Sequence, residues 1–171
     1  MGKLIVITGT PGVGKSHLAK VLARKLGFLR LDLHPHYKEL SIEYNRVKGC
    51  YDLDYTTVDK FVRTYLAKHK KDVVLDSHIA HLLAKSLVDL CIVLTCSDLK
   101  LLEKRLKARR YSKKKVEENL DVERLQVCLG EALDHGHTVA SYETTEKDFE
   151  KRVIEDIHAW KSSFTSRADH I

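Results

Sequence analysis

Short apolar runs and helical patterns alternate along this chain. Five runs have the length and composition of buried strands, and between most of them apolar residues recur every three or four positions. The runs are Leu4 to Thr8, Phe28 to Leu33, Val73 to Asp76, Leu90 to Thr95 and His137 to Tyr142. This alternation predicts an α/β protein with a parallel sheet covered by helices on both faces.

Several helix ends carry residues typical of caps. Thr56 and Thr145, each followed three residues later by Asp, have the spacing of a capping box, and Ser97 lies where an N-cap is expected. We therefore expect helices to begin at these three residues. The final helix has one apolar stripe, which we expect to face the core: Phe149, Val153, Ile157 and Trp160.

Two stretches interrupt the regular alternation, His34 to Asp54 and Ala108 to Lys115. Ligands of open α/β sheets bind at the carboxyl ends of the strands, so such insertions tend to carry substrate contacts. In the first stretch, Tyr37, Leu40 and Tyr44 have helical spacing. This spacing indicates either a plain amphipathic helix or a segment that binds a second anionic substrate.

The chain length favours one domain. A chain of 171 residues can bury a substantial core but is short for two ordinary domains. We expect this domain to span residues 1–160, with a polar tail at 161–171 that frays. No apolar run approaches the roughly 20 residues that cross a bilayer, so no membrane partner is expected.

Cysteine usage and charge narrow the cellular setting. The four cysteines form no CxxC pair, and no signal peptide precedes the first strand, which predicts free thiols and a cytoplasmic location. A nuclear location is the alternative for a eukaryotic source. The formal net charge of +6 suits a protein that handles polyanions, RNA among them. His34 and His36 form an HxH pair without further ligands nearby, so a structural or exposed role is favoured over metal binding.

The stretch GTPGVGKS, Gly9 to Ser16, follows the first strand directly and opens a helix. Such a turn points several backbone N–H groups at one anion, and Gly9, Gly12 and Gly14 permit the wrapping. Lys15 adds a charge that reaches the β and γ phosphates of ATP, and the Ser16 hydroxyl is placed to ligate Mg²⁺. Pro11 and Val13 complete this predicted phosphate-binding loop.

A buried strand that ends in a carboxylate predicts the second part of the site. Asp76 ends the run VVLD and resembles the aspartate that holds the Mg²⁺ shell beside a phosphate loop. His78 follows two residues later, where an imidazole can orient water or touch the γ phosphate; a structural role is equally open. We leave His81 to a structural role.

Cations dominate the second insertion. Arg105 and Arg109 lie four residues apart on a helix face that differs from its leucine face, and they are predicted to grip phosphate oxygens. For the run Lys113 to Lys115, a solvated surface is the favoured reading. Contact of the whole basic run with RNA stays open, since Tyr111 among the cations suits base stacking.

Three motifs together carry a resemblance to a known family. GTPGVGKS, VVLDSH and RLKARRYSKKKVEENL resemble the nuclear adenylate kinase family, also called adenylate kinase isoenzyme six, from about Lys3 to Trp160. Three departures are visible. His17 stands where the family usually has threonine, Arg110 stands where it has glycine before Tyr111, and the acceptor segment HPHYKELSIEYNRVKGCYDLD lacks much of the family's acidic pattern.

The resemblance implies a P-loop fold with a five-stranded parallel sheet, an acceptor-binding insertion near 33–55 and a short lid near 108–118. It implies ATP:AMP phosphoryl transfer with slow ATP hydrolysis, in which the histidine matching His78 is implicated. It also implies that the loop from Glu143 to Glu146, Thr145 included, cradles adenine; His17 and Arg109 are further residues expected to bind the nucleotide. Finally, it implies assembly of the small ribosomal subunit, with a ribosomal protein partner and a link to pre-ribosomal RNA.

Three functions therefore follow from the sequence. The first is an adenylate kinase in which Lys15, Arg105 and Arg109 stabilise the transferring phosphoryl group while Ser16 and Asp76 organise Mg²⁺. The second is an ATP-switched ribosome assembly factor whose nucleotide transfer is incidental. The third, a kinase for a small metabolite, has less support because no second-substrate motif is recognisable.

Overall fold

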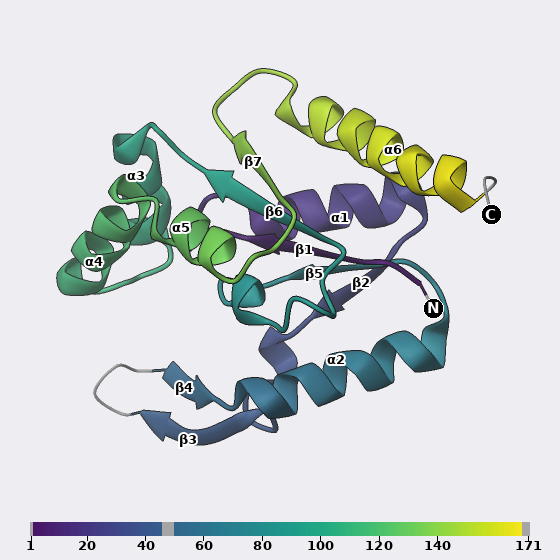
Figure 1. Ribbon diagram of the computed structural model, residues 1–171. Helices are drawn as coiled ribbons and strands as arrows, with labels where there is room; N and C mark the ends of the chain where they lie inside the picture. The colour runs from purple at the N-terminus through teal and green to yellow at the C-terminus, as the bar shows by residue number, and fades with distance from the viewer. Residues whose placement is uncertain (1, 46–49, 169–171) are drawn as a thin grey trace.

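A five-stranded parallel sheet forms the centre of the molecule (Figure 1). The computed structural model describes residues 2–45 and 50–168. The strands lie in the order β2-β5-β1-β6-β7. Their bounds are β1 Leu4–Thr8, β2 Leu29–Asp32, β5 Val73–Asp76, β6 Leu90–Thr95 and β7 Val139–Glu143. The predicted α/β fold class is confirmed, and each predicted strand lies within two residues of an observed one.

Helices cover both faces of the sheet. One face carries α1 (Lys15–Leu26), α3 (Leu99–Ala108), α4 (Lys113–Arg124) and α6 (Phe149–Ala168). The other carries α2 (Tyr55–His69), the short helix η2 (Ala80–Leu82) and α5 (Val127–Asp134). Figure 1 shows α1 and α6 lying above the sheet and α2 below it.

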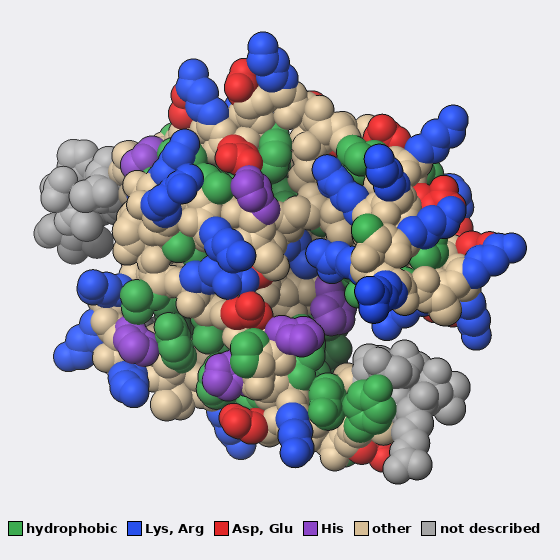
Figure 2. All heavy atoms as spheres, turned by 180° about the vertical axis from the view of Figure 1, so that it is seen from behind, with side chains coloured by type: hydrophobic (Ala, Val, Ile, Leu, Met, Phe, Trp, Pro, Cys, Tyr) green, Lys and Arg blue, Asp and Glu red, His purple; other side chains and the backbone are tan. Residues whose placement is uncertain are grey.

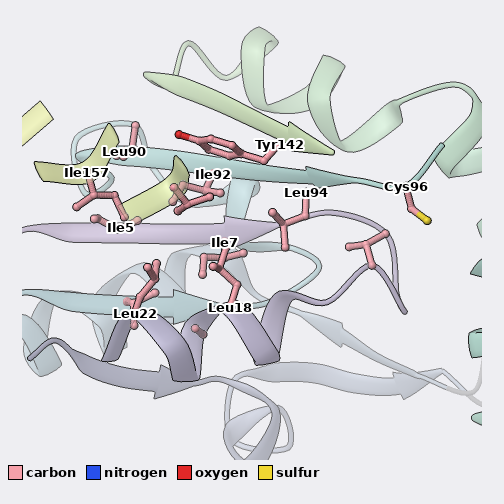
Figure 3. Close-up of a cluster of buried hydrophobic side chains, with 14 of the residues drawn as sticks. Ile5, Ile7, Leu18, Leu22, Leu90, Ile92, Leu94, Cys96, Tyr142 and Ile157 are labelled. Atoms are coloured by element: carbon pink, nitrogen blue, oxygen red, sulfur yellow. The ribbon is translucent and has the colours of Figure 1, made fainter. Parts of the chain in front are cut away.

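Side-chain alternation along the strands divides the core into two clusters. Ile5 and Ile7 of β1 point toward α1, whereas Leu4 and Val6 point toward α2. Figure 3 shows the first cluster, in which Ile5 and Ile7 lie between the helix side chains and β6. Complete burial of each such aliphatic side chain contributes about 1.5–3 kcal/mol. The predicted stripe of the final helix also packs here, through its residues Phe149, Val153, Ile157 and Trp160.

The first insertion is a hairpin, so the predicted amphipathic helix is wrong. A short helix, η1 (His34–His36), is followed by β3 (Ser41–Asn45) and β4 (Cys50–Leu53), which pair antiparallel. Tyr44 lies opposite Tyr51, with ring centroids 5.0 Å apart, on an exposed strand. The cross-strand pairing overrides the three-residue spacing on which the helix was based. Figure 1 shows the hairpin projecting from the body beside α2.

Two helices begin at aspartates near the predicted caps. Asp54 caps α2 by accepting a hydrogen bond from the Thr56 backbone, and Asp98 caps α3. The N-cap of α2 therefore lies two residues before the predicted Thr56, and the N-cap of α3 lies one residue after the predicted Ser97. Aspartate competes effectively for the N-cap because its carboxylate accepts from the backbone and also interacts favourably with the helix dipole.

The last helix extends into the predicted tail. α6 continues to Ala168, so residues 161–168 are helical, and fraying of the segment 161–171 stays a prediction. Lys161 forms an ion pair with Asp72 and lies 4.9 Å from the Phe28 ring centroid. These contacts hold α6 against the body at Lys161.

The described part of the chain contains free thiols but no membrane-spanning helix. Cys91, Cys96 and Cys128 are free, as predicted, and the first two are buried. The side chain of Cys50 lies outside the described part. None of the described helices is long and apolar enough to span a membrane.

Candidate active site

The loop from β1 to α1 has the backbone of a phosphate cradle. Gly9, Gly12 and Gly14 have φ angles of 132°, 94° and 114°, which side-chain-bearing residues rarely adopt. A Cβ on Gly9 would lie 2.4 Å from the carbonyl oxygen of Leu94. Val13 is buried in the core and anchors the loop, while Pro11 is half-buried beside it. The amino end of α1 therefore opens at the carboxyl edge of the sheet, where an anion is favoured.

Lys15 closes this loop from within. Its ammonium donates to the carbonyl oxygens of Gly9, at 2.6 Å, and Thr10, at 2.9 Å. Burial, together with the nearby charge of Arg109, lowers the pKa of Lys15 from 10.5 to about 8. A phosphate that enters the loop would offer this ammonium a full counter-charge in place of two carbonyl dipoles.

The next two residues face outward from the start of α1. Ser16 is exposed and its hydroxyl makes no hydrogen bond within residues 2–45 and 50–168, so it is open to a ligand. His17 is also exposed, and its Nε2 lies 2.7 Å from the carboxylate of Glu150 on α6. This contact ties the phosphate loop helix to the start of the last helix.

Asp76 lies at the carboxyl end of β5, next to β1 and β2. It is paired in register with Ile7 and with Asp32, and it is 5% exposed. Because Val74, two residues earlier, packs against the α1 face, Asp76 points to the same side as the phosphate loop helix. The sequence-based placement of a carboxylate beside the loop is thus reproduced by the fold.

Sequence reasoning missed the partner of Asp76. Arg30 of β2 donates from Nε to Asp76 Oδ1 at 2.7 Å and from NH2 to Oδ2 at 3.0 Å. The same NH2 group also contacts Asp32 at 3.0 Å. The alternation in LRLD places Arg30 and Asp32 on one face of β2, and this pattern was the available signal.

The donor set at this edge fits a magnesium ion carried by a nucleotide. A carboxylate offers about four lone-pair sites, and the Arg30 fork occupies one on each oxygen of Asp76. The remaining sites and the open Ser16 hydroxyl are hard oxygen donors, which Mg²⁺ prefers. Ser16 would hold the ion directly and Asp76 would hold its water shell.

His78 follows β5 at the same edge. It is exposed at the surface, and its ring lies edge-on to Tyr37 with centroids 6.2 Å apart. The surrounding protein atoms, and then the charge of Lys15, lower the pKa of His78 to about 4. The imidazole is therefore neutral at physiological pH.

The two predicted arginines occupy different positions. Arg105 on α3 donates to the carbonyl oxygen of Gly12 at 3.3 Å, so it lies against the phosphate loop. Arg109 is exposed at the carboxyl end of α3 and lies near enough to Lys15 to lower its pKa. Arg110 has φ 59°, the left-handed conformation that glycine adopts without strain.

The lysine run follows Arg110 and lies at the start of α4. Lys113 and Lys114 are exposed, each within 4.0 Å of a glutamate one turn later, as the favoured surface reading predicts. Lys115 lies 4.8 Å from the Tyr111 ring centroid, and Tyr111 packs against the core. Figure 2 shows Lys, Arg and His side chains gathered around a hollow on this side of the molecule.

Thr145 lies in the loop after β7, which precedes α6. Its hydroxyl donates to Glu143 at 2.7 Å, and Glu143 also accepts from the Ser97 backbone at 2.9 Å. The helix begins only at Phe149, so Thr145 is not the N-cap that its spacing indicated. A cavity of about 230 Å³ adjoins Glu143 and the turn after β6.

His81, left to a structural role, lies at the base of the phosphate loop. It is 2% exposed, and its ring bonds Thr8 Oγ1 at 2.6 Å and Glu131 of α5 at 2.8 Å. Its backbone oxygen accepts from His137 at 2.8 Å. His81 thus connects the last residue of β1 to α5, and local spacing gave no signal for this contact.

The rings of the HxH pair pack against aromatic neighbours. His34 lies 5.4 Å from Tyr37, and His36 lies 4.8 Å from Phe61, between ring centroids. Within residues 2–45 and 50–168, no group of three or more His, Cys, Asp or Glu side chains is arranged to hold a metal. These contacts hold the His34 ring against the insertion and the His36 ring against α2.

Comparisons with known proteins agree with this geometry. A family model described as an AAA domain matches residues 5–126. The "Putative adenylate kinase" of Methanocaldococcus jannaschii is 36% identical over 92% of this chain and 85% of its own length. The "Putative adenylate kinase" of Pyrococcus furiosus is 40% identical over 96% of this chain and 87% of its own. The chain belongs to this NMP kinase-like family of P-loop proteins.

Solved structures support the NMP kinase-like fold at a greater distance. A shikimate kinase from Acinetobacter baumannii, solved in complex with shikimate, matches with a TM-score of 0.64 at 15% identity and covers 93% of this chain and 94% of its own. An uncharacterized protein from Eubacterium ventriosum matches with a TM-score of 0.57 at 13% identity. At these identities the likeness concerns the fold alone.

Proposed function

We propose that this chain is an ATP:AMP phosphotransferase, an adenylate kinase that takes ATP together with Mg²⁺. The observation that carries the proposal is the loop from Gly9 to Ser16, closed by Lys15 at the carboxyl edge of the sheet. It occurs in a chain 36–40% identical to archaeal proteins named "Putative adenylate kinase".

The groups at the carboxyl edge of the sheet have different roles in phosphoryl transfer. The backbone N–H groups of the loop hold the β and γ phosphates, and Lys15 and Arg105 neutralise charge on the transferring group. Arg109, exposed at the end of α3, reaches the site when the lid segment closes. Ser16 and Asp76 would hold Mg²⁺ beside the loop, where the ion would supply positive charge to the phosphates. The insertion at 33–55 would hold the acceptor opposite the loop.

The proposal is tested by measuring ADP formation from MgATP with and without AMP, CMP, UMP or GMP. Strong stimulation by AMP alone is expected. Lys15→Ala should lower turnover by about 10²–10³-fold, as loss of a transition-state donor does. Exposed Lys20 of α1 gives the matched control, Lys20→Ala, which should keep full activity. ADP formation indifferent to every monophosphate, or AMP-dependent turnover in Lys15→Ala, would refute the proposal.

A second function is supported by His78. We propose that the chain also hydrolyses ATP slowly, because a neutral imidazole near Lys15 is able to orient a water molecule. His78→Ala should then reduce hydrolysis at least tenfold while AMP-dependent transfer is largely retained. Equal loss of both activities would argue that His78 only supports the site.

Hydrolysis of this kind suits an ATP-switched assembly factor for the small ribosomal subunit. We propose this role on the basis of two exposed surfaces: Ile42 and Tyr44 on the hairpin, which a ribosomal protein would contact, and the cations Lys113 and Lys114, which pre-ribosomal RNA would contact. A pull-down with small-subunit ribosomal proteins, with and without ATP, tests the role. Transfer to a small metabolite would instead appear as kinase activity with no monophosphate acceptor.

A further inference from the structure

Arg30 connects three charged groups at the carboxyl edge of the sheet. Its guanidinium bonds both oxygens of Asp76, at 2.7 and 3.0 Å, and one oxygen of Asp32, at 3.0 Å. The other oxygen of Asp32 accepts from the His34 backbone at 3.0 Å. One cation therefore serves two carboxylates, and the more buried of the two carboxylates, Asp76, receives the two-pronged contact.

The fork restricts what Asp76 is able to do. A bidentate guanidinium fixes the plane of the carboxylate and offsets its charge. With 3% of its side chain exposed, Asp76 has no solvent into which it can swing. Both the direction of its free lone pairs and its attraction for a cation are thus set by Arg30.

We propose that Arg30 is a positioning residue that keeps Asp76 from becoming a direct ligand of Mg²⁺, so that Asp76 contacts the ion only through water. This inference rests on the proposed binding of Mg²⁺ with a nucleotide at the phosphate loop. Mg²⁺ gives up its waters reluctantly, and a carboxylate already paired with a guanidinium competes poorly for them. Weak attachment lets the ion leave with the product nucleotide.

The test is a titration of Mn²⁺ into the full chain saturated with ADP, followed by electron paramagnetic resonance, which reports bound Mn²⁺ without turnover. Arg30→Met removes the charge and should tighten Mn²⁺ binding about tenfold or more. Arg30→Lys keeps the charge and should stay within about threefold of wild type. Unchanged or weaker Mn²⁺ binding in a folded Arg30→Met protein would overturn the proposal.

Asp32→Asn gives a second measurement that does not depend on the folding of Arg30→Met. Asp32 is 39% exposed, so loss of its charge is tolerated, and the whole charge of Arg30 is then directed to Asp76. Mn²⁺ binding should weaken by about threefold, the opposite direction. Tighter or unchanged binding in Asp32→Asn would overturn the proposal. If wild-type protein binds no Mn²⁺ with ADP, the proposed function itself fails; if binding is present but insensitive to residues 30 and 32, only this inference fails.

Discussion

Replacing Gly9 by alanine gives a quantitative test of the phosphate-loop geometry. The φ angle of 132° is strained for any residue with a side chain, which costs about 1–3 kcal/mol. The new Cβ would also lie 2.4 Å from the Leu94 carbonyl oxygen, which belongs to the backbone of a central strand and has little room to move. Forcing one extra carbon into a packed interior costs a further ~1–3 kcal/mol.

We therefore expect Gly9→Ala to lower the free energy of unfolding by about 2–6 kcal/mol, a large share of the ~5–15 kcal/mol typical of a domain. Gly27→Ala is the matched control. Gly27 ends α1 with φ 69°, and a Cβ there meets nothing within 4 Å, so only the backbone cost of about 1–2 kcal/mol remains.

Urea denaturation of both variants, without nucleotide, measures the difference. Gly9→Ala should be the less stable by at least 1 kcal/mol and should also lose ATP binding, whereas Gly27→Ala should bind ATP normally. If the two substitutions cost the same, the close approach of the loop to β6 would have no energetic weight and the reasoning would be wrong.

Two further predictions concern buried polar groups. Folding lowers the pKa of Lys15 from 10.5 to about 8, so below pH 8 the folded state bears an unfavourable charge that is relieved as the pH rises toward 10.5. Lys15→Met should accordingly stabilise the nucleotide-free protein at pH 7, by up to about 3 kcal/mol, with a gain that shrinks to little by pH 10.5 in urea melts; a constant gain would contradict the assignment. His81→Leu should destabilise by about 1–3 kcal/mol, because it leaves the Thr8 hydroxyl, which is inaccessible to solvent, with only a weak contact. Glu131→Ala removes the other side-chain partner of His81, a half-exposed carboxylate, and should lower the free energy of unfolding by about 1 kcal/mol or less. Equal losses of stability in the two variants would count against a special role for the His81 contact with Thr8.

The sheet and the phosphate loop were predictable because their signals are local. An apolar run such as Leu4 to Thr8 predicts a buried strand directly. Lys15 and the glycines before it stand at the fixed spacing of a phosphate-binding loop within eight consecutive residues, Gly9 to Ser16. The position of Arg105 beside the loop was predictable for the same reason, since helical periodicity separates it from the leucine face; its role in binding phosphate stays a prediction.

The rest depends on contacts between distant segments. Arg30 and Asp76 are 46 residues apart, and His81 and Glu131 are 50 apart, so no spacing along the chain links the members of either pair. The hairpin was missed because its stability comes from pairing across strands, while Tyr37, Leu40 and Tyr44 coincide with a helical period. Arg110 is informative in another way. The family has glycine at this position, and Arg110 adopts the left-handed φ of 59° that glycine would adopt without strain; this conformation was not predicted from the sequence.

The two ends of the hairpin segment meet at the body. The backbone N–H of Asp54 donates to the carbonyl oxygen of Leu40 at 3.0 Å, so the chain leaves and re-enters the body at neighbouring positions. Among the described strands, β3 and β4 pair only with each other, while Leu53 of β4 packs against the core cluster beneath α2. An exchanged hairpin would therefore keep its place on the body if it kept an apolar residue at position 53. Under the proposed function, such an exchange would change acceptor choice and leave the phosphate loop as it is.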